Sequence, residues 1–255
     1  MSTTCFLLKT YAKINLTLDI VGVRKDGMHL LNSIVSFINI FDTMLVKIGF
    51  NRHISFIPHP IENSTVHKLL DLLNIPMSIM VYKHIPIGRG LGGSSSNAGG
   101  LLASLVHLGI VDKDTATDIA PKIGADVTMY LYHSPMIMED IGEKITPAPG
   151  LPIPEHLYLI IPDFPSPTPL IYRAWDEQPI ITNFTDRFSK DHVMGNALSI
   201  PFSKVFGINI PQGATLTGSG SSMISISVPN DIPPSWDIIE ITTRNTGWEM
   251  IPYEC

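Results

Sequence analysis

The stretch PIGRGLGGSSSNAGG occupies residues 86–100 and joins a glycine-rich turn to the start of an apolar helix. The apolar segment MSIMVY (residues 77–82) precedes it, and LLASLVHL (residues 101–108) follows it. Glycines at a strand-to-helix junction let backbone N–H groups approach an anion closely, and the positive end of the helix dipole adds favourable charge. The stretch therefore predicts a phosphate-binding loop between a strand and a helix.

Two specific kinds of phosphate-binding loop, and a turn without a ligand, are compared with this stretch first. A P-loop would carry a lysine before its serine, but here Gly93 is followed directly by Ser94. The glycines also satisfy GxGxxG, and Asp112 lies near the offset of about 20 residues at which a dinucleotide fold places its acid. That pattern is weak alone and leaves the serine-rich helix start unexplained. The remaining interpretation, a turn without a ligand, needs only one or two glycines.

Composition limits the classes of protein. The chain has 255 residues, 44% hydrophobic and 16% charged, with a formal net charge of −6, so we expect a globular protein without nucleic-acid partners. No apolar run approaches the ~18 residues of a membrane span, which favours a cytoplasmic protein without a membrane partner. The two cysteines, Cys5 and Cys255, lie near opposite ends of the sequence, and we expect both thiols to be chemically idle.

Apolar periodicity predicts mixed secondary structure along the whole chain. The expected strands cover residues 14–21, 45–48, 54–57, 77–82, 127–132, 157–161 and 223–228, and the expected helices residues 63–73, 101–108, 112–122, a stretch from 170, and 191–198. A proline-rich segment at residues 145–156 interrupts this pattern. We therefore predict an α+β protein with two lobes, residues 1–150 and 151–255, and a small-molecule site between them.

Three segments in order make the chain resemble the GHMP kinases. They are TYAKINLTLDIVGVRKDGMHLLNSI (residues 10–34), the glycine loop, and TLTGSGSSMISI (residues 215–226). The resemblance implies a two-lobe GHMP kinase fold, with an N-terminal lobe like ribosomal protein S5 domain 2 and a ferredoxin-like C-terminal lobe. It also implies ATP and Mg²⁺ as cofactors. The DGMH and PTPLIY segments resemble the branch of the superfamily that phosphorylates a cytidyl alcohol.

Two residues match the family's catalytic positions. Asp126, in GADV, matches the proposed base that accepts the proton of the attacking hydroxyl, and Lys13 matches its neighbour. A cation within ~4–6 Å would keep that carboxylate ionised. Taken alone, Lys13 reads equally as a solvated charge at a strand end, and Asp126 as a cap of a turn.

The resemblance assigns the ATP-binding positions to the glycine loop and to one asparagine. These positions are Pro86, Ile87, Gly88, Arg89, Gly90, Leu91, Gly92, Gly93, Ser94, Ser95, Ser96 and Asn63. Ser95 and Ser96 are the candidates for contact with Mg²⁺, whose ligands are otherwise unknown from the sequence. We expect the Arg89 side chain to point outward. Asn63 is explained equally well as the N-cap of the following helix.

Family positions for the cytidyl alcohol fall in both lobes. They are Asn15, Met28, His29, Thr168, Pro169, Tyr172, Gly218 and Gly220. Tyr172 would stack on the cytosine and Asn15 would contact the alcohol end. A tight turn before a strand is the plain alternative for the two glycines.

The chain departs from the family pattern at three places. Met28 stands where an aromatic residue usually stacks on the second cytosine face, Thr128 replaces a proline, and the segment after residue 230 is short. The alternatives to a cytidyl-alcohol kinase are a homoserine or mevalonate type of GHMP kinase, or a catalytically silent binding protein of this fold. We expect a monomer or a weak homodimer.

Overall fold

The computed structural model describes residues 4–255. Its strands are β1 (Thr4–Asn15), β2 (Thr17–Val23), β3 (His29–Ile48), β4 (His53–Ile57), β5 (Met77–Tyr82), β6 (Met136–Asp140), β7 (Lys144–Pro147), β8 (His156–Ile161), β9 (Gly195–Asn196), β10 (Ala214–Leu216), β11 (Met223–Ser225), β12 (Asp237–Arg244) and β13 (Trp248–Pro252). Its helices are α1 (Thr65–Leu73), α2 (Gly93–His107), α3 (Lys113–Ile123), the 3₁₀ helix η1 (Ala125–Leu131), α4 (Thr168–Glu177), α5 (Phe184–Asp191) and α6 (Ser199–Phe206).

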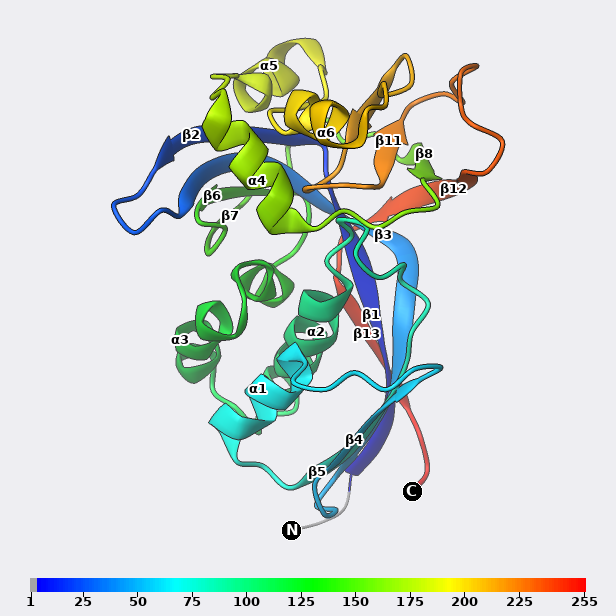
Figure 1. Cartoon of the computed structure of the whole chain (residues 1–255). Coiled ribbons are helices and arrows are strands. Elements are labelled where there is room, and N and C mark those ends of the chain that lie inside the picture. The colour runs from blue at the N-terminus through cyan, green and yellow to red at the C-terminus, as the bar shows by residue number, and fades with distance from the viewer. Residues whose placement is uncertain (1–3) are drawn as a thin grey trace.

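The long strand β3 belongs to both lobes (Figure 1). Its C-terminal half pairs with β1 and β5 in the lower lobe of the figure, and its N-terminal half pairs with β2 and β6. Between these halves, Phe37 and Ile38 pair with β12. One strand therefore carries the hydrogen-bonded ladder from the first lobe into the second, and the strands form the path β10-β11-β8-β12-β3-β1-β13.

Helices α1, α2 and α3 cover one face of the sheet in the N-terminal lobe (Figure 1). Their apolar sides, with those of β1, β3 and β5, form a core that includes Leu8, Val46, Leu69 and Leu101. Helix α1 begins at a capping box, in which the Ser64 side chain and the His67 ring satisfy each other's backbone N–H groups. The packing of α2 against the sheet in this core holds the start of α2, where the glycine loop ends, in place.

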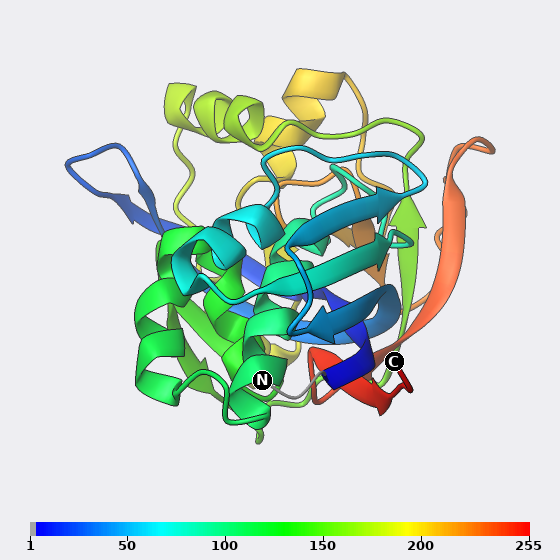
Figure 2. The same cartoon turned by 90° about the horizontal axis from the view of Figure 1, so that it is seen from below.

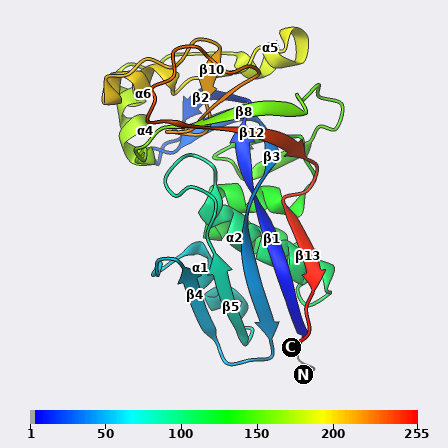
Figure 3. The ribbon, with the colours of Figure 1, turned by 90° about the vertical axis from the view of Figure 1, so that its right-hand side faces the viewer.

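In the C-terminal lobe, α4, α5 and α6 lie together over strands β8, β10 and β11 (Figure 3). Trp175, Phe202, Leu216 and Met223 are buried in the core between these layers. Together the two lobes confirm the α+β, two-lobe prediction. Within the described residues, no helix combines the length and the apolar character needed to cross a membrane.

The chain returns to the N-terminal lobe at its end. Strand β13 pairs antiparallel with β1, with Phe6 opposite Pro252 and Thr10 opposite Trp248. The segment after residue 230 is thus part of the sheet on which the site is built. The division at residue 150 stays a prediction.

Two predicted elements are wrong. Residues 127–132 lie in the 3₁₀ helix η1 and its C-cap, because a short buried apolar run has the same sequence pattern in a strand and in a helical turn. Residues 191–198 are not a helix: α5 ends at Asp191, His192 takes a left-handed backbone conformation, and Gly195–Asn196 pairs with β2. The strands at residues 77–82 and 157–161 and the helix at residues 112–122 are confirmed to within a residue or two.

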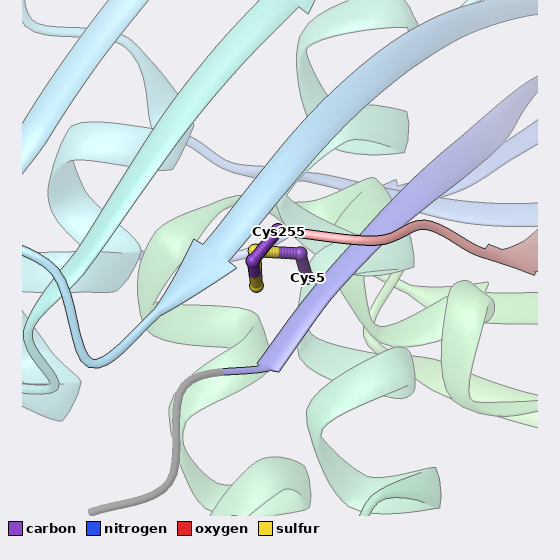
Figure 4. Close-up of a disulfide and its surroundings, with 2 residues drawn as sticks. All are labelled: Cys5 and Cys255. Atoms are coloured by element: carbon purple, nitrogen blue, oxygen red, sulfur yellow. A yellow bond between two sulfur atoms is a disulfide. The ribbon is translucent and has the colours of Figure 1, made fainter.

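The prediction of two idle thiols is also wrong. Cys5 and Cys255 form a disulfide, with their Cα atoms 5.3 Å apart (Figure 4). The sequence separation of 250 residues hid this pair, whereas the pairing of β13 with β1 brings Cys255 close to Cys5. The two strands lie beside each other in the view from below (Figure 2).

The disulfide gives a stability prediction. Replacing Cys255 with Ser should lower the free energy of unfolding by about 2–4 kcal/mol, since a cross-link over a long loop restricts the unfolded chain. Denaturant unfolding with and without a thiol reductant measures this. The reductant should destabilise the native chain and leave Cys255→Ser unchanged; equal curves for the oxidised native chain and the variant would contradict the prediction.

Candidate active site

A cavity of about 810 Å³ lies between the two lobes. Strand β1, the glycine loop and the start of η1 contribute its N-terminal side, while α4 and the turn at residues 218–219 contribute the other side. The residues predicted from sequence that line it are Lys13, Asn15, Met28, His29, Pro86, Ile87, Gly88, Arg89, Gly90, Leu91, Gly92, Gly93, Ser94, Ser95, Asp126, Thr168, Pro169, Tyr172 and Gly218. Asn63, Ser96 and Gly220 are not among the lining residues.

Lys13 and Asp126 meet in this cavity. The Lys13 Nζ lies 3.7 Å from the Asp126 Oδ2, and the side chains are 6% and 30% exposed, respectively. Lys13 reaches the site from β1, and Asp126 stands at the start of η1, directly after Gly124 ends α3. A carboxylate that is open to the cavity and has an ammonium group beside it is suited to accept a proton from a bound hydroxyl.

The Asn15 side chain is occupied by protein partners. Its Oδ1 accepts a hydrogen bond of 2.5 Å from the Lys13 Nζ, and its Nδ2 donates one of 2.7 Å to the Ser33 hydroxyl. Ser33 in turn donates to the Thr17 carbonyl. Asn15 therefore orients Lys13, and its amide keeps a second N–H and a second lone pair for contact with a ligand.

The glycine loop takes a conformation that only glycine adopts easily. Gly88, Gly90 and Gly92 have φ values of 70°, 77° and 68°. A Cβ atom on Gly90 would lie 2.4 Å from the Thr217 carbonyl oxygen, so the loop touches the backbone of the second lobe. The loop is thus shaped both by its own dihedral angles and by the turn opposite it.

The N-terminus of α2 opens at the end of this loop. Its N-cap is Gly92, which offers no side-chain cap, and the first turn holds no acidic residue. No protein acceptor for the N–H groups of Gly93, Ser94 and Ser95 is found within residues 4–255. These free donors at the positive end of a helix dipole suit the phosphates of a nucleotide.

Arg89 does not point outward, which corrects the expectation for this residue. Its guanidinium donates to the carbonyls of Pro162 and Phe164 and lies 3.3 Å from the Ser221 hydroxyl. Its own carbonyl accepts from the Ser222 N–H. The side chain therefore fastens the glycine loop to the C-terminal lobe.

Ser96 is corrected as a candidate Mg²⁺ contact. Its hydroxyl is fully buried and lies 3.2 Å from the Thr10 hydroxyl, and its N–H donates to the Gly92 carbonyl. Ser95 lines the cavity, as does Ser94, whose carbonyl accepts from the Thr65 hydroxyl at 2.6 Å. Only the first two serines of the run face the site.

A buried ion pair beneath the loop escaped the sequence prediction. The Lys83 ammonium binds the Asp42 carboxylate and the Asn97 amide oxygen, and Asn97 donates to Asp42 at 2.9 Å. The other oxygen of Asp42 accepts from the N–H groups of His84 and Ile85, just before the loop. This network fixes both ends of the loop, and nothing in the local sequence around Asp42 signals it.

Asn63 does not cap α1. The N-cap is Ser64, and Asn63 precedes it with a φ of 52°. Asn63 instead lines a neighbouring hollow of about 400 Å³ together with Glu62 and His67. Ser64 and Thr65, on the other hand, do line the main cavity.

The opposite end of the cavity is aromatic. The rings of His29 and Tyr172 lie 4.7 Å apart between centroids and are tilted by 44°. Burial, and secondly the charge of Asp126, raise the pKa of the Tyr172 phenol well above its usual range, so the phenol stays protonated. Met28, beside them, is 45% exposed.

The turn at residues 217–221 completes the site. Gly218 and Ser219 line the cavity, and the Ser219 hydroxyl lies 2.7 Å from that of Thr168. Gly220 faces the core instead, since a Cβ there would lie 2.8 Å from Phe202 and Leu216. Gly220 thus has a structural role, and Ser219 is a lining residue that the sequence prediction missed.

A kinase family can now be assigned. The model of the GHMP kinases N terminal domain matches residues 62–134, which include the glycine loop and Asp126. The glycine loop, the start of α2 and Asp126 all lie within the matched residues. Residues 62–134 thus match the N-terminal domain of the GHMP kinases, and the fold of the chain agrees with that family.

Relatives narrow this assignment. The chain is 39% identical over 152 residues to a 4-diphosphocytidyl-2-C-methyl-D-erythritol kinase from Fervidobacterium nodosum, over 57% of this chain and 55% of that protein. It is 27% identical over 256 residues to the kinase of the same name from Symbiobacterium thermophilum, over 86% and 89% of the two chains. The alignment with the first relative thus spans about half of that protein's length.

A solved structure shares the fold. The crystal structure of a 4-(cytidine 5'-diphospho)-2C-methyl-D-erythritol kinase aligns with a TM-score of 0.75 and 23% identity, over 93% of this chain and 99% of that one. At this identity the likeness concerns the fold. The resemblance inferred from the sequence motifs is confirmed at the level of the family and its fold.

Proposed function

We propose that this chain phosphorylates a hydroxyl of 4-diphosphocytidyl-2-C-methyl-D-erythritol with ATP, a step of isoprenoid precursor synthesis. The observation that carries the proposal is the Lys13–Asp126 pair, which faces the same cavity as the free N-terminus of α2. The relatives' names supply the acceptor alcohol.

In this proposal, ATP supplies the phosphoryl group, and the chain's own residues position it. The N–H groups of Gly93, Ser94 and Ser95 bind phosphate oxygens, and the left-handed glycines let the loop backbone approach them. Asp126 accepts the proton of the attacking hydroxyl, while Lys13, 3.7 Å from the carboxylate, orients that hydroxyl. Asn15 and Ser33 keep Lys13 in place.

Mg²⁺ is part of the same proposal. Within residues 4–255, no group of three or more His, Cys, Asp or Glu side chains could hold a metal ion by protein ligands alone. That suits an ion which keeps several waters and is held mainly by nucleotide phosphates. Ser94 and Ser95 line the cavity, and their hydroxyls could join the ligands of such an ion.

The test is a panel of acceptors in a coupled ATP-turnover assay. The proposal expects turnover with 4-diphosphocytidyl-2-C-methyl-D-erythritol and none with homoserine or mevalonate. Turnover with homoserine or mevalonate alone would support kinase activity but contradict the cytidyl alcohol as the acceptor. ATP binding without turnover on any acceptor would favour a catalytically silent binding protein.

Met28 gives a prediction for the proposed cytidine end. A thioether against an aromatic ring contributes about 0.3–1.5 kcal/mol, whereas a base stacked on an aromatic side chain contributes about 1–3 kcal/mol. Met28→Tyr should therefore lower the KM for the cytidyl alcohol about threefold to tenfold. The KM for ATP serves as the control and should not change; an unchanged or raised KM for the alcohol would refute the argument.

The remaining partner statements are proposals as well. We propose a monomer or weak homodimer without nucleic-acid partners. A cytoplasmic location remains part of the proposal, although disulfides such as Cys5–Cys255 are uncommon in that reducing compartment. Counting free thiols in protein purified under alkylating conditions tests whether the bond exists in the cell.

A further inference from the structure

Three residues of α4 hold the His29 ring in one orientation. Tyr172, Trp175 and Asp176 stand at positions i, i+3 and i+4, so they share one face of the helix. The Trp175 ring meets the His29 ring edge-on at 5.5 Å, and the Tyr172 ring lies 4.7 Å from the His29 ring at a tilt of 44°. The His29 side chain is only 12% exposed.

The Asp176 carboxylate determines which nitrogen of the His29 ring carries the proton. Its Oδ1 lies 2.7 Å from the His29 Nε2. An ionised carboxylate is an acceptor only, so Nε2 must carry the proton, and in the neutral imidazole Nδ1 is then an acceptor. Within residues 4–255 no protein group bonds to Nδ1, and it is not one of the buried atoms closed off from solvent.

We propose that Asp176 is a positioning residue that makes His29 an acceptor toward the cavity and thereby selects a pyrimidine with an amino group. His29 lines the cavity and its Nδ1 has no protein partner within residues 4–255, so this nitrogen can accept a hydrogen bond from a ligand. Cytosine offers an N–H donor at position 4, whereas uracil carries a carbonyl oxygen there, which would face another acceptor. This inference rests on the proposed function, because it assumes that the base lies at the aromatic end.

Stability gives no sufficient reason for the contact. The Asp176 side chain is 50% exposed, and hydrogen-bonded charges at that exposure contribute little to folding. The aromatic neighbours already hold the ring by packing. What the carboxylate adds is the position of the proton, which packing cannot determine.

The test compares the wild-type chain with Asp176→Ala in binding CDP and UDP by calorimetry. We expect the wild type to prefer CDP by about tenfold or more, and Asp176→Ala to reduce that preference at least about fivefold, mainly by weakening CDP. Glu177→Ala is the matched control: it removes a neighbouring carboxylate that is 63% exposed and pairs with Lys204, and it should keep the wild-type preference.

The ring proton is measured independently of any ligand. A ¹H–¹⁵N spectrum of the His29 ring at about pH 8, where free imidazoles are neutral, should show the proton on Nε2 in the wild type and a mixture of both forms in Asp176→Ala. A proton on Nδ1 in the wild type would overturn the proposal, as would equal losses of CDP and UDP binding in the variant. If Asp176→Ala kept the wild-type preference for CDP, this inference alone would be overturned. If the wild type bound neither nucleotide, the proposed function would be overturned together with this inference.

Discussion

Asp126→Asn should abolish most of the turnover while leaving the protein folded and able to bind nucleotide. The asparagine keeps the shape of the side chain beside Lys13 but cannot accept a proton. A positioned acid or base contributes about 10²–10⁴-fold to a rate, so kcat should fall within that range. The carboxylate is 30% exposed but Lys13 is only 6% exposed, so neutralising the carboxylate should cost some stability, and denaturant unfolding of the variant checks that it stays folded.

The matched control for this substitution is Asp118→Asn. Asp118 lies on α3, is 70% exposed and pairs with Lys122 on the same helix, outside the cavity lining. Steady-state kinetics and nucleotide binding measured side by side separate chemistry from affinity. If Asp126→Asn kept more than about a tenth of the wild-type kcat, Asp126 would not be the proton acceptor.

Gly90→Ala should disable the loop. Gly90 has a φ of 77°, and a Cβ there would lie 2.4 Å from the Thr217 carbonyl oxygen and 2.9 Å from that of Gly220. Both are backbone atoms, so either the loop or the opposite turn must move. We expect nucleotide affinity and kcat/KM to fall about a hundredfold or more, because a displacement of about 1 Å at a reacting site has that effect.

Gly109→Ala is the control that separates the steric clash of a new Cβ from the backbone strain of a positive φ. Gly109 has a φ of 69°, similar to Gly90, but nothing lies within 4 Å of its added Cβ. It should lose about 1 kcal/mol of stability and keep its activity. Should the two variants lose activity equally, the contact between the loop and the second lobe would not be the cause.

The sequence predicted the parts of the site that lie on short motifs. The loop at residues 86–95 could be predicted because so many clustered glycines are rarely needed for a plain turn. Lys13 and Asp126 were predicted because each lies in a short motif that resembles the family. Lys83 and Asp42 were missed because their pairing depends on β3 and β5 lying side by side. Ser96 was misplaced because its direction depends on the phase of α2, which the sequence alone does not fix.

The errors in the fold have a similar cause. The buried turn at η1 has the composition of a strand, and only its surroundings decide between the two. Cys5 and Cys255 looked unrelated because the path of β13 back to β1 cannot be read from either end. Long-range pairing, rather than local propensity, is therefore what the sequence prediction lacked.

The bond between Cys5 and Cys255 makes the oxidised backbone a covalent ring. A single cut in any loop between these residues opens the ring and leaves one connected molecule. Because β1 and β13 are already paired, a peptide link between them would replace the disulfide without moving either strand. The chain could then begin and end at an exposed loop tip instead. The chain is thus suited to circular permutation, with the old termini joined where the disulfide now holds them.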